Sequence, residues 1–112
     1  MNTRWIPITQ LEQISEIGAS TGYSLIFKHS TQCSVSMMAK RTFEMEMDSI
    51  PASVSLYFLD LIRFRNISAE IADKFNVKHE SPQIILLDSG KSIFNASHSD
   101  ISAVEVGSLV SN

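Results

Sequence analysis

Short apolar runs alternate with helix-patterned segments along this chain, and this alternation constrains the fold more than any other feature. Residues 24–29, 54–62 and 83–87 are rich in branched and aromatic side chains and have the length of strands. Segments with apolar residues at helical spacing precede, separate and follow these runs. Strands that alternate with helices pair in parallel, because a parallel pair needs a long crossover connection. The sequence therefore predicts an α/β fold.

Four helices are expected from the apolar spacing and from capping signals. A capping box at residues 9–12 opens the first, which stops near Gly18. The second runs from Cys33 to a point before Pro51, Ser68 caps the third, and Ser97 or Ser99 caps the last. The apolar faces, in chain order, are expected to be Leu11, Ile14 and Ile17; Val35, Met38, Ala39, Thr42 and Phe43; Ile67, Ile71, Ala72 and Phe75; and Ile101, Val104 and Leu109.

The last two predicted strands are expected to form a hairpin. Asp88-Ser89-Gly90-Lys91 has the composition of a tight turn, and residues 92–95 follow it as a further strand. This adds an antiparallel edge to the parallel strands, and residues 4–8 are a candidate for a short first strand. The expected architecture is a central mixed sheet with helices on both faces.

Composition limits the class of protein. The 112 residues suffice for one domain, assigned to residues 1–112, and 44% hydrophobic residues suffice for a core. The net charge is −3 and the basic residues are scattered, which argues against nucleic-acid binding. The longest aliphatic run covers residues 84–87, too short to cross a membrane, and the first seven residues lack the apolar stretch of a secretory signal. A cytoplasmic protein is expected.

Cys33 is the only cysteine, and it lies where a predicted buried strand ends and a predicted helix begins. Backbone N–H groups and the positive end of the helix dipole meet at such a corner, so a thiolate there is stabilised and nucleophilic. The alternative is a structural cysteine in the core. Cys33 has polar neighbours, Gln32 and Ser34, which favours the functional interpretation.

Two further motifs fit thiol chemistry. Residues 33–36 read Cys-Ser-Val-Ser, a C-x-x-S form of the C-x-x-C redox motif, in a strand–helix–strand context. Ser81-Pro82 opens the third predicted strand, where an X-Pro bond is either cis and close to the reactive cysteine or an ordinary trans bond. We expect the cis form, with Pro82 within van der Waals reach of the Cys33 sulfur.

Other polar residues are given structural roles. His29, His79 and His98 show no paired zinc spacing, so no metal site is expected and loop hydrogen bonds are favoured, with a local electrostatic influence of His29 on the thiolate as a further option. Met38 is assigned to the core, whereas Lys40, Arg41 and the carboxylates of residues 44–48 are assigned to solvated surface.

The segments 27–36, 79–83 and 97–99 together resemble the YtxJ-type monothiol bacilliredoxins of the thioredoxin-like superfamily. The resemblance covers essentially the whole chain. It implies a thioredoxin-like fold and cytoplasmic thiol chemistry that depends on bacillithiol, with Cys33 as the active cysteine and Pro82 as the cis-proline. Such proteins usually have proline directly after the cysteine, whereas this chain has Ser34.

A chain with one thiol must stop at a mixed disulfide and needs a second thiol from solution to be released. For bacilliredoxin-like chemistry, bacillithiol is that co-substrate, no cofactor is bound, and the partners are S-bacillithiolated proteins. The expected groove is formed by Gln32, Ser34, Ser36, Ser81 and Pro82. The competing interpretation is a non-catalytic adaptor that grips a partner chain or an iron-sulfur cluster.

Overall fold

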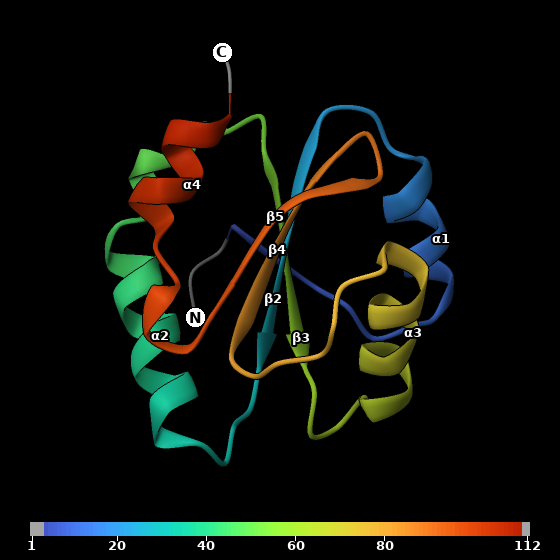
Figure 1. Ribbon diagram of the computed structural model, residues 1–112, viewed down its shortest axis with the longest axis horizontal. Coiled ribbons are helices and arrows are strands. Elements are labelled where there is room, and N and C mark those ends of the chain that lie inside the picture. Colours follow the sequence, from blue (N-terminus) through green and yellow to red (C-terminus); the bar gives the residue numbers. More distant parts are fainter. Residues whose placement is uncertain (1–3, 111–112) are drawn as a thin grey trace.

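The computed structural model describes residues 4–110, in which five strands and four α-helices alternate (Figure 1). Residues 1–3, which belong to the stretch predicted not to be a secretory signal, lie outside the described residues. The elements in chain order are β1 (Trp5–Pro7), α1 (Glu12–Ala19), β2 (Tyr23–His29), α2 (Ser34–Met45), η1 (Met47–Ser49), β3 (Ser55–Asp60), α3 (Arg65–Phe75), β4 (Gln83–Asp88), β5 (Lys91–Ser97), η2 (His98–Asp100) and α4 (Ala103–Leu109).

The strands form one mixed sheet in the order β1-β3-β2-β4-β5. β1 and β2 both run parallel to β3, while β4 pairs antiparallel with β2 and with β5. The predicted mixed sheet and the predicted short first strand are therefore confirmed. The hairpin turn is also confirmed: Ser89 and Gly90 both have positive φ, and a side-chain carbon at Gly90 would collide with the carbonyl oxygen of Gly18.

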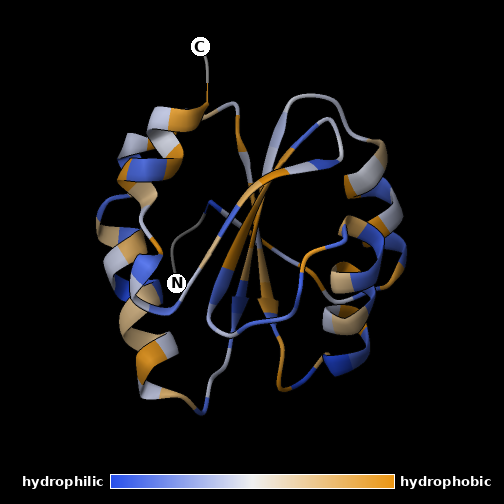
Figure 2. Ribbon diagram, viewed as in Figure 1, coloured by the Kyte–Doolittle hydropathy of each residue, from blue (hydrophilic) through white to orange (hydrophobic). Residues whose placement is uncertain are grey.

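Helices cover both faces of the sheet, α2 and α4 on one side and α1 and α3 on the other (Figure 1). Alternate residues of the buried strand β2 face opposite layers, as the period of a strand requires. Leu25 and Phe27 pack with Phe43 and Met47 under α2, whereas Ile26 packs under α1 and α3. Figure 2 shows the hydrophobic residues concentrated on the central strands. No helix among residues 4–110 is long and apolar enough to cross a membrane.

The predicted helix starts were wrong in three places. The Thr9–Glu12 capping box does not form, because the side chain of Gln13 accepts the backbone N–H groups of residues 9 and 10 instead. α3 begins at Arg65, so Ser68 lies inside the helix. Ser102, rather than Ser97 or Ser99, caps α4 by accepting the N–H of Glu105 at 3.1 Å. No side chain caps α1 or α3, and the cap of α4 is a serine nearer to the helix than the two expected.

The predicted faces of α2 and α4 were only partly right. In α2, Phe43 is buried as predicted, but Val35 and Met38 are 52% and 70% exposed, and Ser36 is buried in their place. In the last predicted face, Ile101 is buried as predicted, but Val104 and Leu109 are exposed, and Ala103 and Val106 of α4 are buried instead. The inward face of α2 carries polar residues, so a search for an apolar stripe selects the adjacent, outward face.

Candidate active site

Four loops meet at one edge of the sheet, at the bottom of Figure 1. They follow the carboxyl ends of β2 and β3, precede β4, and follow β5. In open α/β sheets, functional side chains gather beside the carboxyl ends of the parallel strands. This edge carries Cys33 and the Ser81-Pro82 segment.

Cys33 is the residue immediately before the first turn of α2, with extended backbone angles (φ −118°, ψ 121°). Its N–H donates to the carbonyl of Ser30 at 3.3 Å, and its own carbonyl accepts the N–H of Met37 at 3.0 Å. The thiol is free and partly exposed, and its sulfur makes no capping hydrogen bond. The predicted strand-to-helix corner is confirmed, and Cys33 is not a fully buried core residue.

The predicted groove residues around Cys33 lie at different depths. Gln32 and Ser34 are exposed on either side of it. Ser36 is 0% exposed and points into the protein. Of these three predicted groove residues, Gln32 and Ser34 present their side chains at the surface and Ser36 does not.

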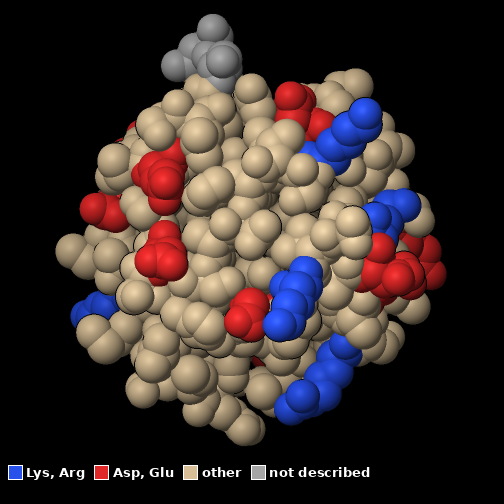
Figure 3. All heavy atoms as spheres, viewed as in Figure 1, with Lys and Arg blue, Asp and Glu red and all other residues tan. Residues whose placement is uncertain are grey.

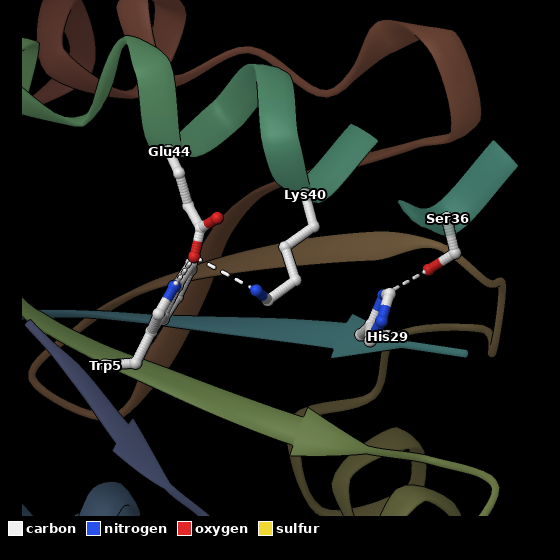
Figure 4. A network of polar contacts seen from close by, with 5 residues as sticks. All are labelled: Trp5, His29, Ser36, Lys40 and Glu44. Carbon is white, nitrogen blue, oxygen red and sulfur yellow. Dashed lines mark hydrogen bonds and ion pairs between the residues drawn. The ribbon is translucent and has the colours of Figure 1, made fainter. Parts of the chain in front are cut away.

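Ser36 ties the start of α2 to the end of β2 (Figure 4). Its Oγ accepts the backbone N–H of Ser30 at 3.0 Å and lies 2.7 Å from Nδ1 of His29. Both partners are buried. These contacts span the loop that carries Cys33, so the Ser36 hydroxyl fixes the position of that loop.

His29 lies beneath α2 with its ring against Phe58. Burial lowers the pKa of His29 below its usual value of 6.5, and the charge of Lys40 acts in the same direction, against the carboxylates of Asp60 and Glu44. The imidazole is therefore neutral near neutral pH. The hydrogen-bonding role expected for this histidine is confirmed.

Lys40 and Glu44 are not solvated surface residues, contrary to prediction. Lys40 Nζ lies 3.0 Å from Oε2 of Glu44, and the same oxygen accepts the indole N–H of Trp5 at 2.7 Å (Figure 4). The ammonium also lies 5.2 Å from the centre of the Phe58 ring. These residues link α2 to β1 and β3 beside His29. Met38, predicted to be core, is exposed.

The Ser81-Pro82 bond is cis, which confirms the expected isomer. Lys28 of β2 pairs with Gln83 of β4, so Pro82 lies one step beyond this pair, at the same edge as Cys33. The carbonyl of Pro82 accepts the N–H of His98 at 3.0 Å. The Ser81 hydroxyl is buried and has no hydrogen-bond partner among the described residues. Contact between Pro82 and the Cys33 sulfur stays a prediction.

An apolar hollow of about 290 Å³ lies between α2 and the segment after β5. It explains the exposure of Val35 and Met38, which line one side, while His98 and Ile101 line the other. His98 is also the residue bonded to the Pro82 carbonyl. The hollow therefore adjoins the cis-proline segment.

A polar cluster that the sequence interpretation missed lies on the other side of β2. Lys28 is 0% exposed, and its Nζ lies 3.2 Å from Nδ1 of His79 in the α3–β4 loop. Burial lowers the pKa of Lys28 from 10.5 to about 8. Burial, and next the charge of Lys28, lower the pKa of His79. The sequence signal for this cluster is Lys28 itself, a lysine inside an otherwise apolar strand. The prediction included it in the apolar run and gave it no role.

Within residues 4–110, no group of three or more His, Cys, Asp or Glu side chains is arranged to hold a metal ion. His29 and His79 are instead bonded to Ser36 and Lys28. The free thiol of Cys33 lies at this edge.

Comparisons with known proteins agree with this chemistry. Residues 6–106 match the family described as monothiol bacilliredoxin BrxC. A solved structure provisionally described as an oxidoreductase with a thioredoxin fold superposes with a TM-score of 0.80 at 29% identity, over 93% of this chain and 91% of the other. Thioredoxin from Trypanosoma brucei brucei superposes with a TM-score of 0.71 at 18% identity, over 96% of this chain and 91% of the other. Thioredoxin from Malassezia sympodialis superposes with a TM-score of 0.70 at 18% identity, over 95% of this chain and 91% of the other.

The two thioredoxins establish the fold alone, and that fold is the predicted thioredoxin-like α/β fold. The family match covers nearly the whole chain and, with the oxidoreductase fold, supports a thiol redox function. The chain belongs to the monothiol bacilliredoxin family.

Proposed function

We propose that this protein is a monothiol thiol-disulfide oxidoreductase that removes bacillithiol from protein mixed disulfides. One observation carries the proposal: the only cysteine of the chain lies at the start of α2, partly exposed, at the sheet edge that also holds the cis Ser81-Pro82 bond. A thiol at a helix amino terminus is placed where its anion is stabilised.

The reaction balances without an internal second thiol. The Cys33 thiolate attacks the bacillithiol sulfur of the mixed disulfide, and the substrate protein leaves as its thiolate. Cys33 is then disulfide-bonded to bacillithiol. A second thiol from solution attacks this bond, releases a bacillithiol-containing disulfide and returns Cys33 to the thiolate.

The groove for this reaction consists of the surface residues on both sides of Cys33, Gln32 and Ser34, and the Ser81-Pro82 segment opposite them. The unpartnered Ser81 hydroxyl supports this assignment, because a buried polar group without a partner is costly unless a ligand satisfies it. Ser36 serves the groove indirectly, by holding the loop. The apolar hollow beside Pro82 suits an apolar side chain of the substrate protein.

The co-substrate in this proposal is bacillithiol, no cofactor is bound, and the partners are S-bacillithiolated proteins in the cytoplasm. The family match and the single cysteine support these assignments. The scattered charge gives no support for nucleic acid as a partner.

The test follows the loss of bacillithiol from a modified protein by intact mass. The unmodified chain should remove the adduct when a small thiol is present, and Cys33→Ala should remove none. Ser15→Ala, an exposed serine on α1 in the opposite helix layer, is the control and should act at the normal rate. Removal by Cys33→Ala would rule out the mechanism, and binding without exchange would identify an adaptor.

A further inference from the structure

Lys28 is a fully buried cation, and none of the carboxylates in residues 4–110 forms an ion pair with it. The ion pair of Lys40 and Glu44 lies on the other face of the sheet. The side-chain partner of Lys28 is instead Nδ1 of His79, at 3.2 Å. Since an ammonium group only donates hydrogen bonds, this nitrogen accepts, and the neutral imidazole carries its proton on Nε2.

A cavity of about 300 Å³ adjoins this pair, between α3 and the α3–β4 loop. Arg65, Ser68 and His79 line it, together with Leu61 and Ala69. None of these five residues is a carboxylate. The Ser68 hydroxyl, which is buried, lies 3.4 Å from the same His79 nitrogen that faces Lys28.

Two cations lie beside the cavity, Arg65 in its wall and Lys28 behind His79. Both disfavour a protonated imidazole, while Glu80 acts in the opposite direction, more weakly than Lys28 and more strongly than Arg65. The first turn of α3 holds no acidic residue, and Phe64, which precedes it, offers no side-chain cap. On the face shown in Figure 3, basic and acidic side chains lie next to one another on the α3 side of the molecule.

A buried ammonium costs free energy unless an opposite charge is near it. An anion in the cavity would supply that charge, and a guanidinium forms two parallel bonds with a carboxylate. The walls formed by Leu61 and Ala69 suit an apolar body rather than a hydrated inorganic ion. We propose that this cavity binds the carboxylate of a small organic acid, with Arg65, Ser68 and Nε2–H of His79 as donors and Lys28 as the buried countercharge.

This site lies beyond the proposed thiol exchange and does not need Cys33. His79 precedes Pro82 by three residues, so the cavity and the cysteine share one edge of the sheet but lie in different helix layers. A bound acid would therefore contact the segment that leads into the cis-proline.

Benzoate is the probe, and benzamide is its uncharged counterpart. The ring signals of His79 are followed by NMR in the full-length chain during titration with each compound. We expect saturable shifts and a raised His79 pKa with benzoate, because a bound anion favours the imidazolium. Benzamide should cause no saturable shift, and inorganic sulfate should bind at least tenfold more weakly than benzoate.

Variants locate the site. Arg65→Gln and Lys28→Met should each weaken benzoate binding at least tenfold, with folding checked by circular dichroism. Arg63→Gln is the matched control: this exposed arginine lies over the Phe64 ring and does not line the cavity. Cys33→Ala should bind benzoate normally, which separates this test from that of the thiol exchange.

Three results would overturn the proposal. The first is the absence of a saturable shift with benzoate. The second is equal binding of benzamide or of sulfate. The third is a loss of benzoate affinity in Arg63→Gln that is as large as the loss in Arg65→Gln.

Discussion

Two consecutive residues at the end of β2 place polar groups on opposite sides of the sheet. Lys28 points toward α3 and contacts His79, whereas His29 points toward α2 and contacts Ser36. Burial lowers the pKa of both side chains. Each is held by one specific partner, because a buried polar group needs a hydrogen bond to offset its lost hydration. The strand that leads to Cys33 therefore ends in two fixed contacts.

Ser36→Ala should destabilise the fold and slow thiol exchange. Removal of the hydroxyl leaves the Ser30 N–H and the His29 Nδ1 buried without their partner, which costs about 1–3 kcal/mol. The measurement is urea unfolding followed by the fluorescence of Trp5, the only tryptophan. Ser34→Ala, exposed two residues earlier, should change the free energy of unfolding by less than about 0.5 kcal/mol. Equal stability of the two variants would remove the structural role assigned to Ser36.

Lys28→Met should make the stability less dependent on pH above neutrality. The folded lysine has a pKa of about 8 against 10.5 unfolded, so its charge opposes folding fully below about pH 8, and this penalty disappears as pH rises toward 10.5. One pKa unit corresponds to about 1.4 kcal/mol. The free energy of unfolding of the unmodified chain should therefore rise by about 2 kcal/mol relative to that of the variant between about pH 7.5 and 10. Urea unfolding at several pH values measures this gain. If the difference in the free energy of unfolding between the unmodified chain and Lys28→Met does not change with pH, Lys28 is well hydrated in the folded protein.

At the scale of elements, α2 is held by polar contacts as much as by its apolar face. Ser36 and Glu44 bond to β2 and β1, and Phe43 packs with Trp5 and Phe27. The outward side of α2 leaves Val35 and Met38 to line a hollow beside η2. The sheet edge thus gains an apolar surface next to Pro82, because some apolar side chains of α2 face outward.

Ser102→Ala should destabilise α4 by about 1 kcal/mol. Its hydroxyl accepts the N–H of Glu105, and loss of such a cap costs about 0.5–2 kcal/mol. Ser99→Ala is the matched control, because the sequence pattern favoured this residue as the cap but its side chain holds no helix N–H. Thermal unfolding compares the two variants. A larger loss of stability for Ser99→Ala than for Ser102→Ala would contradict the assignment of Ser102 as the cap.

At the scale of the whole molecule, one cysteine in 112 residues decides what kind of exchange is possible. The fold brings the carboxyl end of β2, the start of α2 and the cis-proline to one edge. The position three residues after the cysteine holds Ser36, which is buried and bonded. No thiol of the chain can resolve a disulfide formed at Cys33.

The protein should therefore reduce an intraprotein disulfide, such as those of insulin, far more slowly than it removes a small thiol from a mixed disulfide. Its turnover should also rise with the concentration of the small thiol, because release of Cys33 depends on that thiol. Insulin turbidity and intact-mass assays at a series of thiol concentrations test both points. Efficient insulin reduction, or a rate independent of thiol concentration, would contradict a monothiol mechanism.

The sequence by itself determined the order of strands and helices, the mixed sheet, the closing hairpin, the strand-to-helix corner at Cys33 and the cis bond at Pro82. These features follow from local signals: apolar runs of strand length, turn residues, and the family resemblance of residues 27–36 and 79–83. Such signals act over a few residues, so a single chain displays them directly.

The apolar spacing predicted the buried residues Ile14 and Ile17 of α1 and Ile67, Ile71 and Phe75 of α3. Only the tertiary structure decided which side of α2 and of α4 is buried and what the buried polar residues bind. Lys28 and Glu44 are charged, yet each contacts a residue far along the chain. Ser36 is fully buried and contacts the end of β2. These positions are stable because His79, Trp5 and Ser30 supply hydrogen bonds at the right distance. The sequence shows a lysine inside an apolar strand at position 28, but not that His79 is its partner, because the two residues come together only when the chain folds.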